Sequence, residues 1–164
     1  MKYTILCMGA PKEMYYKEAL AEFQKRMIPL GGLEIVSLKP APTAGRELKP
    51  EEIRQALSRE AEEFRRVLSQ PRFARALKIA LCIEGKIFSS EELAHLLDKA
   101  ATSGKDGAVF LVGSSWGIDA GVKALCDQRL SFSPMTFAHS LFQVMLSEQI
   151  YRAAGILAGS KYHK

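Results

Sequence analysis

The side chains best suited to chemistry gather in the last third of the sequence. The segment 131–139 is apolar and aromatic and ends in His139, whose imidazole titrates near neutrality and can accept a proton. Taken alone, a histidine at the start of a helix is more often a surface or capping residue than a catalyst. The segment before it can instead line an apolar pocket for a ring such as adenine. The sequence by itself allows both interpretations.

Further titratable groups follow His139 at helical spacing. Glu148, Tyr151 and Arg152 share one face of the last predicted helix. Glu148 four residues before Arg152 is the favourable orientation for an intrahelical ion pair, and Arg152 can alternatively hold a phosphate or a base oxygen. The C-terminal segment adds Tyr162 and His163, although chain ends are usually frayed and solvated.

The segment Gly113–Gly117 follows a buried apolar run directly. Its glycines let the backbone approach a ligand closely, but an ordinary strand-to-helix turn explains them as well. The sequence contains neither G-x-x-x-x-G-K-[ST] nor G-x-G-x-x-G. The usual elements for ATP hydrolysis and for dinucleotide binding are therefore missing.

The cysteines and the charge narrow the class of protein. Cys7, Cys82 and Cys126 lack any paired C-x-x-C spacing, so we expect small buried side chains in a reducing compartment and no metal site. The net charge of +5 fits a polyanionic partner such as RNA, although acidic residues interleave with the basic ones in 51–78. The first apolar run is too short for a signal peptide and no run is long enough to span a membrane, so we expect a cytoplasmic protein.

Strands and helices alternate along the sequence. We expect strands at 3–8, 33–38, 77–83, 108–112 and 129–132, and helices at 12–27, 51–68, 90–103, 119–126 and 140–157. Pro11 should open the first helix, Gly85 should end the third strand, and 39–46 should form a loop. Ser89 and Glu92 should form a capping box at the start of the third helix. The alternation predicts one α/β domain, 1–164, whose mostly parallel sheet is covered by helices on both faces. A small ligand should then bind in the loops that follow Ile83, Val112 and Phe132.

Four segments together carry a family resemblance: Leu111–Gly113 with Gly117, Leu130–His139, Glu148–Ala153 and Tyr162–Lys164. In this combination the chain resembles, over essentially its whole length, the RlmH family. These are SPOUT-class methyltransferases that modify N3 of a pseudouridine in large-subunit (23S) ribosomal RNA. The resemblance implies a homodimer and an α/β sheet whose C-terminal part forms a trefoil knot.

The resemblance also implies a site. S-adenosylmethionine would lie in the knot, and the residues expected to contact it are Leu81, Cys82, Gly113, Ser114, Gly117, Ser133, Pro134, Met135, Thr136, Phe137 and Ala138. The candidate catalytic residues are His139, Glu148, Arg152, Tyr162 and His163, and the C-terminal tail would reach the active site across the dimer interface.

The chain differs from the usual family pattern in the glycine segment, where Ser114, Ser115 and Trp116 stand between the two glycines. Ala138 stands where a proline is usual, and Gln143 where a basic residue is common. Three functions follow from these observations. The first is the pseudouridine N3-methyltransferase, the second another SPOUT RNA methylase with a ribose or tRNA target, and the third a catalytically inactive module that binds RNA or the ribosome.

Overall fold

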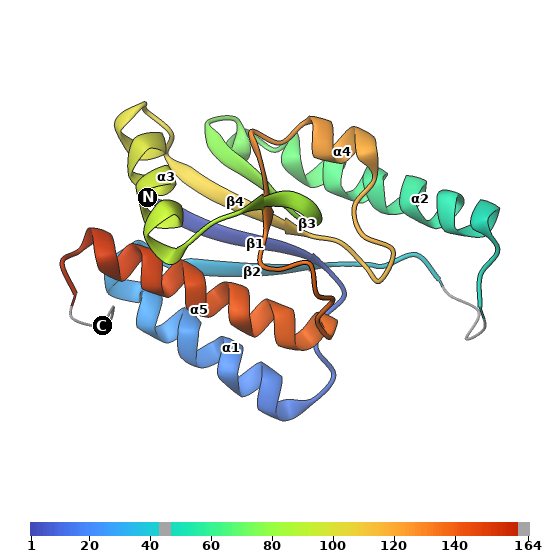
Figure 1. The fold of residues 1–164 in the computed structure, drawn as a ribbon, viewed down its shortest axis with the longest axis horizontal. Helices are drawn as coiled ribbons and strands as arrows, with labels where there is room; N and C mark the ends of the chain where they lie inside the picture. The colour runs from blue at the N-terminus through green and yellow to red at the C-terminus, as the bar shows by residue number, and fades with distance from the viewer. Residues whose placement is uncertain (43–46, 161–164) are drawn as a thin grey trace.

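A five-stranded sheet in which every strand pairing is parallel forms the centre of the protein (Figure 1). The structure is a computed structural model and describes residues 1–42 and 47–160. The strand order is β2-β1-β4-β3-β5. The strands are β1 (Lys2–Met8), β2 (Leu33–Leu38), β3 (Ala76–Ile87), β4 (Gly107–Val112) and β5 (Gln128–Ser131).

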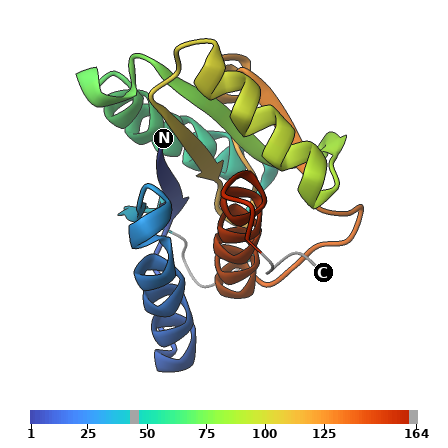
Figure 2. The same cartoon turned by 90° about the vertical axis from the view of Figure 1, so that its left-hand side faces the viewer.

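Helices cover both faces of the sheet. They are α1 (Met14–Met27), α2 (Pro50–Leu68), α3 (Ser90–Thr102), α4 (Ala120–Ala124) and α5 (His139–Leu157), with short 3-10 turns at Ile28–Leu30 and Pro71–Phe73. The helices α1, α3 and α5 pack on one face, and α2 and α4 on the other. Figures 1 and 2 show α1 and α5 side by side.

The central strand β4 is apolar throughout, and β1 is apolar from Ile5 to Met8, because both faces of these strands are covered. Along β1, Tyr3, Ile5 and Cys7 point into the core beneath α1, α3 and α5, while Leu6 and Met8 point into the core beneath α2. This alternation follows from the two-residue period of a strand. The predicted fold class, a mostly parallel α/β sheet with helices on both faces, is confirmed.

Two element boundaries differ from the sequence prediction for a physical reason, and the other predicted bounds are shifted by at most two residues. Pro11 does not open the first helix, which begins at Met14, because the backbone of Glu13 is still extended at φ −72° and ψ 133°. Gly85 does not end the third strand, since β3 continues to Ile87. The pairing of β3 with β5 shifts register between Leu81 and Lys86.

The register shift explains the glycine inside β3. A Cβ atom on Gly85 would lie 2.6 Å from the carbonyl carbon of Leu130, so only glycine lets the backbone of β5 pass this close. A glycine within a strand thus marks an irregular pairing here and not the end of the strand. The path from β5 into α5 is consistent with the trefoil knot that the family resemblance implies, and the knot itself stays a prediction.

The lengths and compositions of the helices bear on membrane association. Within residues 1–42 and 47–160, none of the helices combines the length and the apolar character that crossing a bilayer requires.

Candidate active site

A cavity of about 570 Å³ opens at the ends of β4 and β5 and beside residues 81–84 within β3. Its walls are formed by residues 81–84, 112–118, 130–133 and 135–139, together with Lys123 and Phe142. The carboxyl edge of a parallel sheet is the usual position of a ligand site, and the volume lies within the range of small-molecule sites. The predicted loops after Val112 and Phe132 therefore meet in one cavity, whereas the predicted loop after Ile83 is wrong, because residues 81–84 line the cavity from within β3.

Most of the residues predicted to contact the cofactor line this cavity. They are Leu81, Cys82, Gly113, Ser114, Gly117, Ser133, Met135, Thr136, Phe137 and Ala138. Pro134 is the exception, since it is exposed and does not line the cavity. His139 also lines the cavity, so the structure brings one candidate catalytic residue to the predicted cofactor site.

The loop after β4 turns back on itself at the cavity wall. The N–H of Gly117 donates to the carbonyl of Ser114 at 2.9 Å, and the backbone of Gly117 has a φ of +83°. A Cβ on Gly113 would lie 2.1 Å from the carbonyl oxygen of Gly117, whereas a Cβ on Gly117 would meet no atom within 4 Å. Gly113 is thus needed for close packing and Gly117 for its left-handed conformation.

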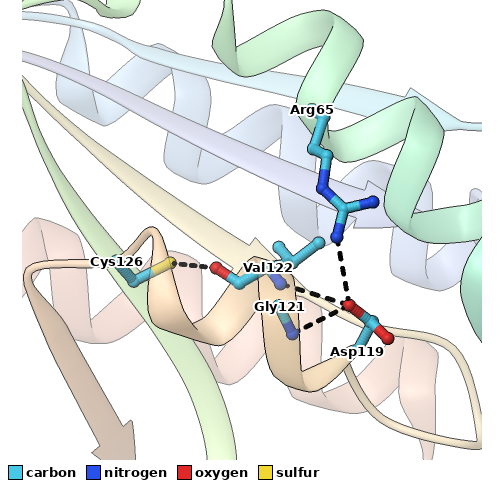
Figure 3. Close-up of polar contacts among 5 residues, drawn as sticks. All are labelled: Arg65, Asp119, Gly121, Val122 and Cys126. Carbon is cyan, nitrogen blue, oxygen red and sulfur yellow. Dashed lines mark hydrogen bonds and ion pairs between the residues drawn. The ribbon is translucent and has the colours of Figure 1, made fainter.

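The helix α4 holds the far end of this loop in place (Figure 3). The Asp119 carboxylate caps α4 by accepting from the N–H groups of Gly121 at 2.9 Å and Val122 at 3.3 Å. Arg65 on α2 lies 3.4 Å from the same oxygen. A short helix has little stability of its own, so these contacts with α2 help to fix it.

A cysteine packs against the same short helix. The Cys126 thiol contacts the Val122 carbonyl at 3.5 Å (Figure 3). Burial, helped by the neighbouring charge of Asp127, raises the pKa of Cys126 to about 11. Cys126 therefore stays protonated at neutral pH and behaves as an apolar packing group, as the sequence suggested.

The loop after β5 is apolar and is anchored by local contacts. The Ser131 hydroxyl donates to the carbonyl of Ser133 at 3.1 Å, and the N–H of Met135 donates to the Ser133 hydroxyl at 3.0 Å. The Phe142 ring on α5 packs against Phe132 and Phe137, with ring centroids 4.9 Å and 6.1 Å away. The aromatic residues thus form a continuous wall from the loop into the first turns of α5.

His139 is oriented by the end of β1. Its Nε2 atom lies 2.7 Å from the carbonyl oxygen of Met8 and 3.3 Å from the side-chain amide nitrogen of Gln143. A carbonyl can only accept, so in the shorter contact, with Met8, Nε2 carries the hydrogen. The remaining ring nitrogen, Nδ1, then holds the lone pair. Burial lowers the pKa of His139 below its ordinary value, so the imidazole is neutral at pH 7. His139 therefore has the tautomer and the protonation state of a general base.

An ion pair lies on the polar side of the cavity. Lys123 pairs with Glu84 and holds the pKa of that carboxyl below its usual value. Burial and then the charge of Glu84 raise the pKa of Cys82, which lines the cavity as a neutral thiol. The sequence did not single out this pair, because its members are 39 residues apart and neither belongs to a motif.

Glu148 lies in a different hollow. This second hollow, of about 440 Å³, lies between α1, α3 and α5 and shares only Leu130 and Phe132 with the first. The predicted ion pair is confirmed, since Arg152 donates to Glu148 through Nε at 3.0 Å and Nη2 at 2.6 Å. Within this chain, the structure does not bring Glu148 and Arg152 to the cavity that His139 lines.

Two other predicted catalytic residues, Tyr162 and His163, lie outside the described residues. The structure adds a residue that the sequence analysis missed. Glu60 is a charged residue at a helical position between Ala56 and Phe64, both of which are buried. A lone carboxylate on the apolar stripe of a helix is a signal for a buried polar partner.

The residues around the cavity suit S-adenosylmethionine. Phe132 and Phe137 provide apolar surface for an adenine ring, and the hydroxyl groups of Ser133 and Thr136 can bind its polar groups. The open space beside Gly117 leaves backbone accessible to a ligand. No group of three or more metal-ligating side chains occurs in the part of the chain that the structure describes.

A parallel α/β sheet with a cavity of this size at its carboxyl edge is typical of proteins that bind a nucleotide-type ligand. The sequence model of one protein family, described as a predicted SPOUT methyltransferase, matches residues 1–163. The chain therefore belongs to the SPOUT methyltransferase family. Its cofactor is S-adenosylmethionine, as the sequence predicted.

Solved structures show the same fold at low sequence identity. The tRNA (m1G37) methyltransferase from Aquifex aeolicus is 16% identical with a TM-score of 0.53, and the match covers 99% of this chain and 73% of that one. A probable rRNA-methyltransferase from Porphyromonas gingivalis is 11% identical with a TM-score of 0.51, covering 95% and 69%. A probable methylase family protein from Haemophilus influenzae Rd KW20 is 12% identical with a TM-score of 0.50, covering 99% and 70%.

Proposed function

We propose that this protein methylates N3 of a pseudouridine in 23S ribosomal RNA. The observation that carries the proposal is the position of His139, which lines the predicted cofactor cavity with Nε2 bonded to Met8 and Nδ1 able to accept a proton. A ring N–H must lose its proton when the nitrogen is methylated, whereas a group without a proton needs no base. The whole-chain resemblance to the RlmH family indicates that the methylated nitrogen is N3 of a pseudouridine.

S-adenosylmethionine supplies an electrophilic methyl group on its sulfonium. The residues of this chain must therefore hold the target nitrogen in line with that methyl group and remove the nitrogen's proton. His139 is the favoured base because it lines the cavity, and Tyr162 and His163 remain alternatives. Glu148 is less suited within one chain, because it lines the second hollow and pairs with Arg152.

The proposed substrate also requires contacts with RNA. A base inside a folded RNA must be turned out of its stack before its edge is accessible. Arg152, Lys161 and Lys164 are candidates for phosphate contacts, and such contacts weaken steeply with salt. We further propose that the protein is a homodimer whose tail completes the partner's active site. A ribosomal substrate would place the protein in the cytoplasm.

The proposal is tested with purified protein, labelled S-adenosylmethionine and three substrates: ribosomes, free 23S RNA and bulk tRNA. Nuclease digestion and mass spectrometry should find one new methyl group on a pseudouridine base of the 23S RNA. A methyl group on tRNA or on a ribose oxygen would instead support another SPOUT methylase. Ribosome binding without cofactor binding, measured by calorimetry up to millimolar S-adenosylmethionine, would support the inactive module.

The proposed role of the tail is tested by deleting residues 162–164. We expect the truncated protein to lose methyl transfer, because Tyr162 and His163 would be missing from the partner's site. It should keep the thermal unfolding transition of the full chain, since the sheet and its helices lie outside the deleted segment. Full activity in the truncated protein would refute this assignment.

A further inference from the structure

A buried carboxylate joins α2 to the wall of the cofactor cavity. Glu60 is only 3% exposed, although a charged group in the interior is costly unless it is hydrogen-bonded. Its Oε2 atom accepts from the Ser114 hydroxyl at 2.8 Å, and its Oε1 atom accepts from the N–H of Ala41 at 3.1 Å. One carboxylate therefore contacts both the loop after β4 and the segment after β2.

The charge of Glu60 determines the direction of these hydrogen bonds. A carboxylate can only accept, so the Ser114 hydroxyl must donate to it. The lone pairs of Ser114 Oγ then remain available to the N–H of Trp116, which lies 3.4 Å away. Since the Ser114 carbonyl also accepts from Gly117 at 2.9 Å, both the side chain and the backbone of Ser114 hold the turn closed.

We propose that Glu60 is a positioning residue, which acts through Ser114 to fix the 114–117 turn in the shape that binds the cofactor. Glu60 does not line the cavity, whereas Ser114, Trp116 and Gly117 do. Its effect on binding must therefore pass through the turn. The role in binding rests on the proposed function, since it takes this cavity as the S-adenosylmethionine site.

The test uses Trp116, the only tryptophan of the chain, as a reporter located in the turn itself. Acrylamide quenching and fluorescence anisotropy of Trp116 are measured without cofactor in wild type, Glu60→Ala, Glu60→Gln and Ser114→Ala. Glu62→Ala is the matched control, because Glu62 is an exposed carboxylate two residues away on the same helix. We expect greater quenching and lower anisotropy in Glu60→Ala and Ser114→Ala, a smaller change in Glu60→Gln, and wild-type values in Glu62→Ala.

Calorimetry with S-adenosylmethionine then measures the effect on binding. Loss of the hydrogen bond should raise the Kd about tenfold in Glu60→Ala, and the double variant Glu60→Ala/Ser114→Ala should bind no more weakly than the weaker single variant. Unchanged Trp116 fluorescence in Glu60→Ala would overturn the proposal. So would an unchanged Kd, or additive effects of the two substitutions.

The two measurements separate this proposal from the proposed function. A wild-type protein that binds no S-adenosylmethionine refutes the proposed function and the binding role of Glu60, while the fluorescence still shows whether Glu60 fixes the turn. If Glu60→Ala does not fold, Ser114→Ala and Glu60→Gln decide the question. Ser114→Ala removes one hydroxyl group, and Glu60→Gln keeps the size of the side chain.

Discussion

Gly113→Ala tests how tightly the loop after β4 is packed. The new methyl group would lie 2.1 Å from the carbonyl oxygen of Gly117, 2.4 Å from its carbonyl carbon and 2.8 Å from Cγ1 of Ile118. Contacts of this length between carbon and backbone do not occur, so the turn must open by roughly an ångström. Overpacking of this kind usually costs 1–3 kcal/mol, and the rigid backbone on the other side makes about 3 kcal/mol the expected loss of folding free energy.

Gly117→Ala is the matched control in the same loop. Its methyl group would meet no atom within 4 Å, so the only cost is the left-handed backbone at φ +83°. That conformation costs a residue with a side chain about 1–2 kcal/mol. The two substitutions add the same methyl group four positions apart, and we expect Gly113→Ala to be the more harmful one.

Urea unfolding, followed by circular dichroism, measures both variants. The midpoint should fall more for Gly113→Ala than for Gly117→Ala, with similar slopes if both variants still unfold in two states. Calorimetry with S-adenosylmethionine should show a larger loss of affinity for Gly113→Ala, since the turn lines the cavity. A Gly113→Ala protein as stable as wild type, or more stable than Gly117→Ala, would refute the packing argument.

Three further predictions concern other parts of the protein. In Gly85→Ala the new Cβ would lie 2.6 Å from the carbonyl carbon of Leu130, so we expect the free energy of unfolding to fall by about 1–3 kcal/mol, seen as a lower urea midpoint. An unchanged midpoint would contradict the β3–β5 register. Burial lowers the pKa of His139, so below about pH 6.5 the unfolded chain binds a proton more readily than the folded protein, and the folding free energy of wild type should fall as the pH falls. A single group contributes at most about 1.4 kcal/mol per pH unit, because only one proton is bound. His139→Gln should lose less folding free energy than wild type between pH 7.5 and 5.5, measured by urea unfolding. With a pKa of about 11, Cys126 should react with iodoacetamide at pH 8 far more slowly in the native protein than in urea, and rapid native labelling found at Cys126 by peptide mapping would contradict its burial.

Local patterns in the sequence predicted the elements and several contacts within them. The strand Leu33–Leu38 has the bounds that were predicted. Ser89 and Glu92 form the predicted capping box, with the Ser89 hydroxyl accepting from Glu92 at 3.2 Å and the Glu92 carboxylate accepting from Ser89 at 2.7 Å. These predictions succeeded because the interacting residues are three or four positions apart, so helix geometry alone brings them together.

The site depended on pairs of residues that are far apart in the sequence. His139 is oriented by Met8, 131 residues away, and Ser114 is held by Glu60, 54 residues away. The predicted cofactor contacts came from the family resemblance, and the structure shows that ten of the eleven line one cavity. Periodicity could not have supplied them, because it identifies strands without giving their order in the sheet.

The sequence by itself determined that this protein is a parallel α/β protein with its ligand loops after the fourth and fifth strands. Only the tertiary structure decided that Gly85 lies inside β3, because the need for glycine there comes from the close backbone of β5 and not from neighbours in the sequence. The tertiary structure also showed that Glu148 and His139, although both on α5, line different hollows of the protein. The physical reason is the strand order β2-β1-β4-β3-β5, because this order determines which loops and helix faces meet. No local pattern in the sequence contains the strand order.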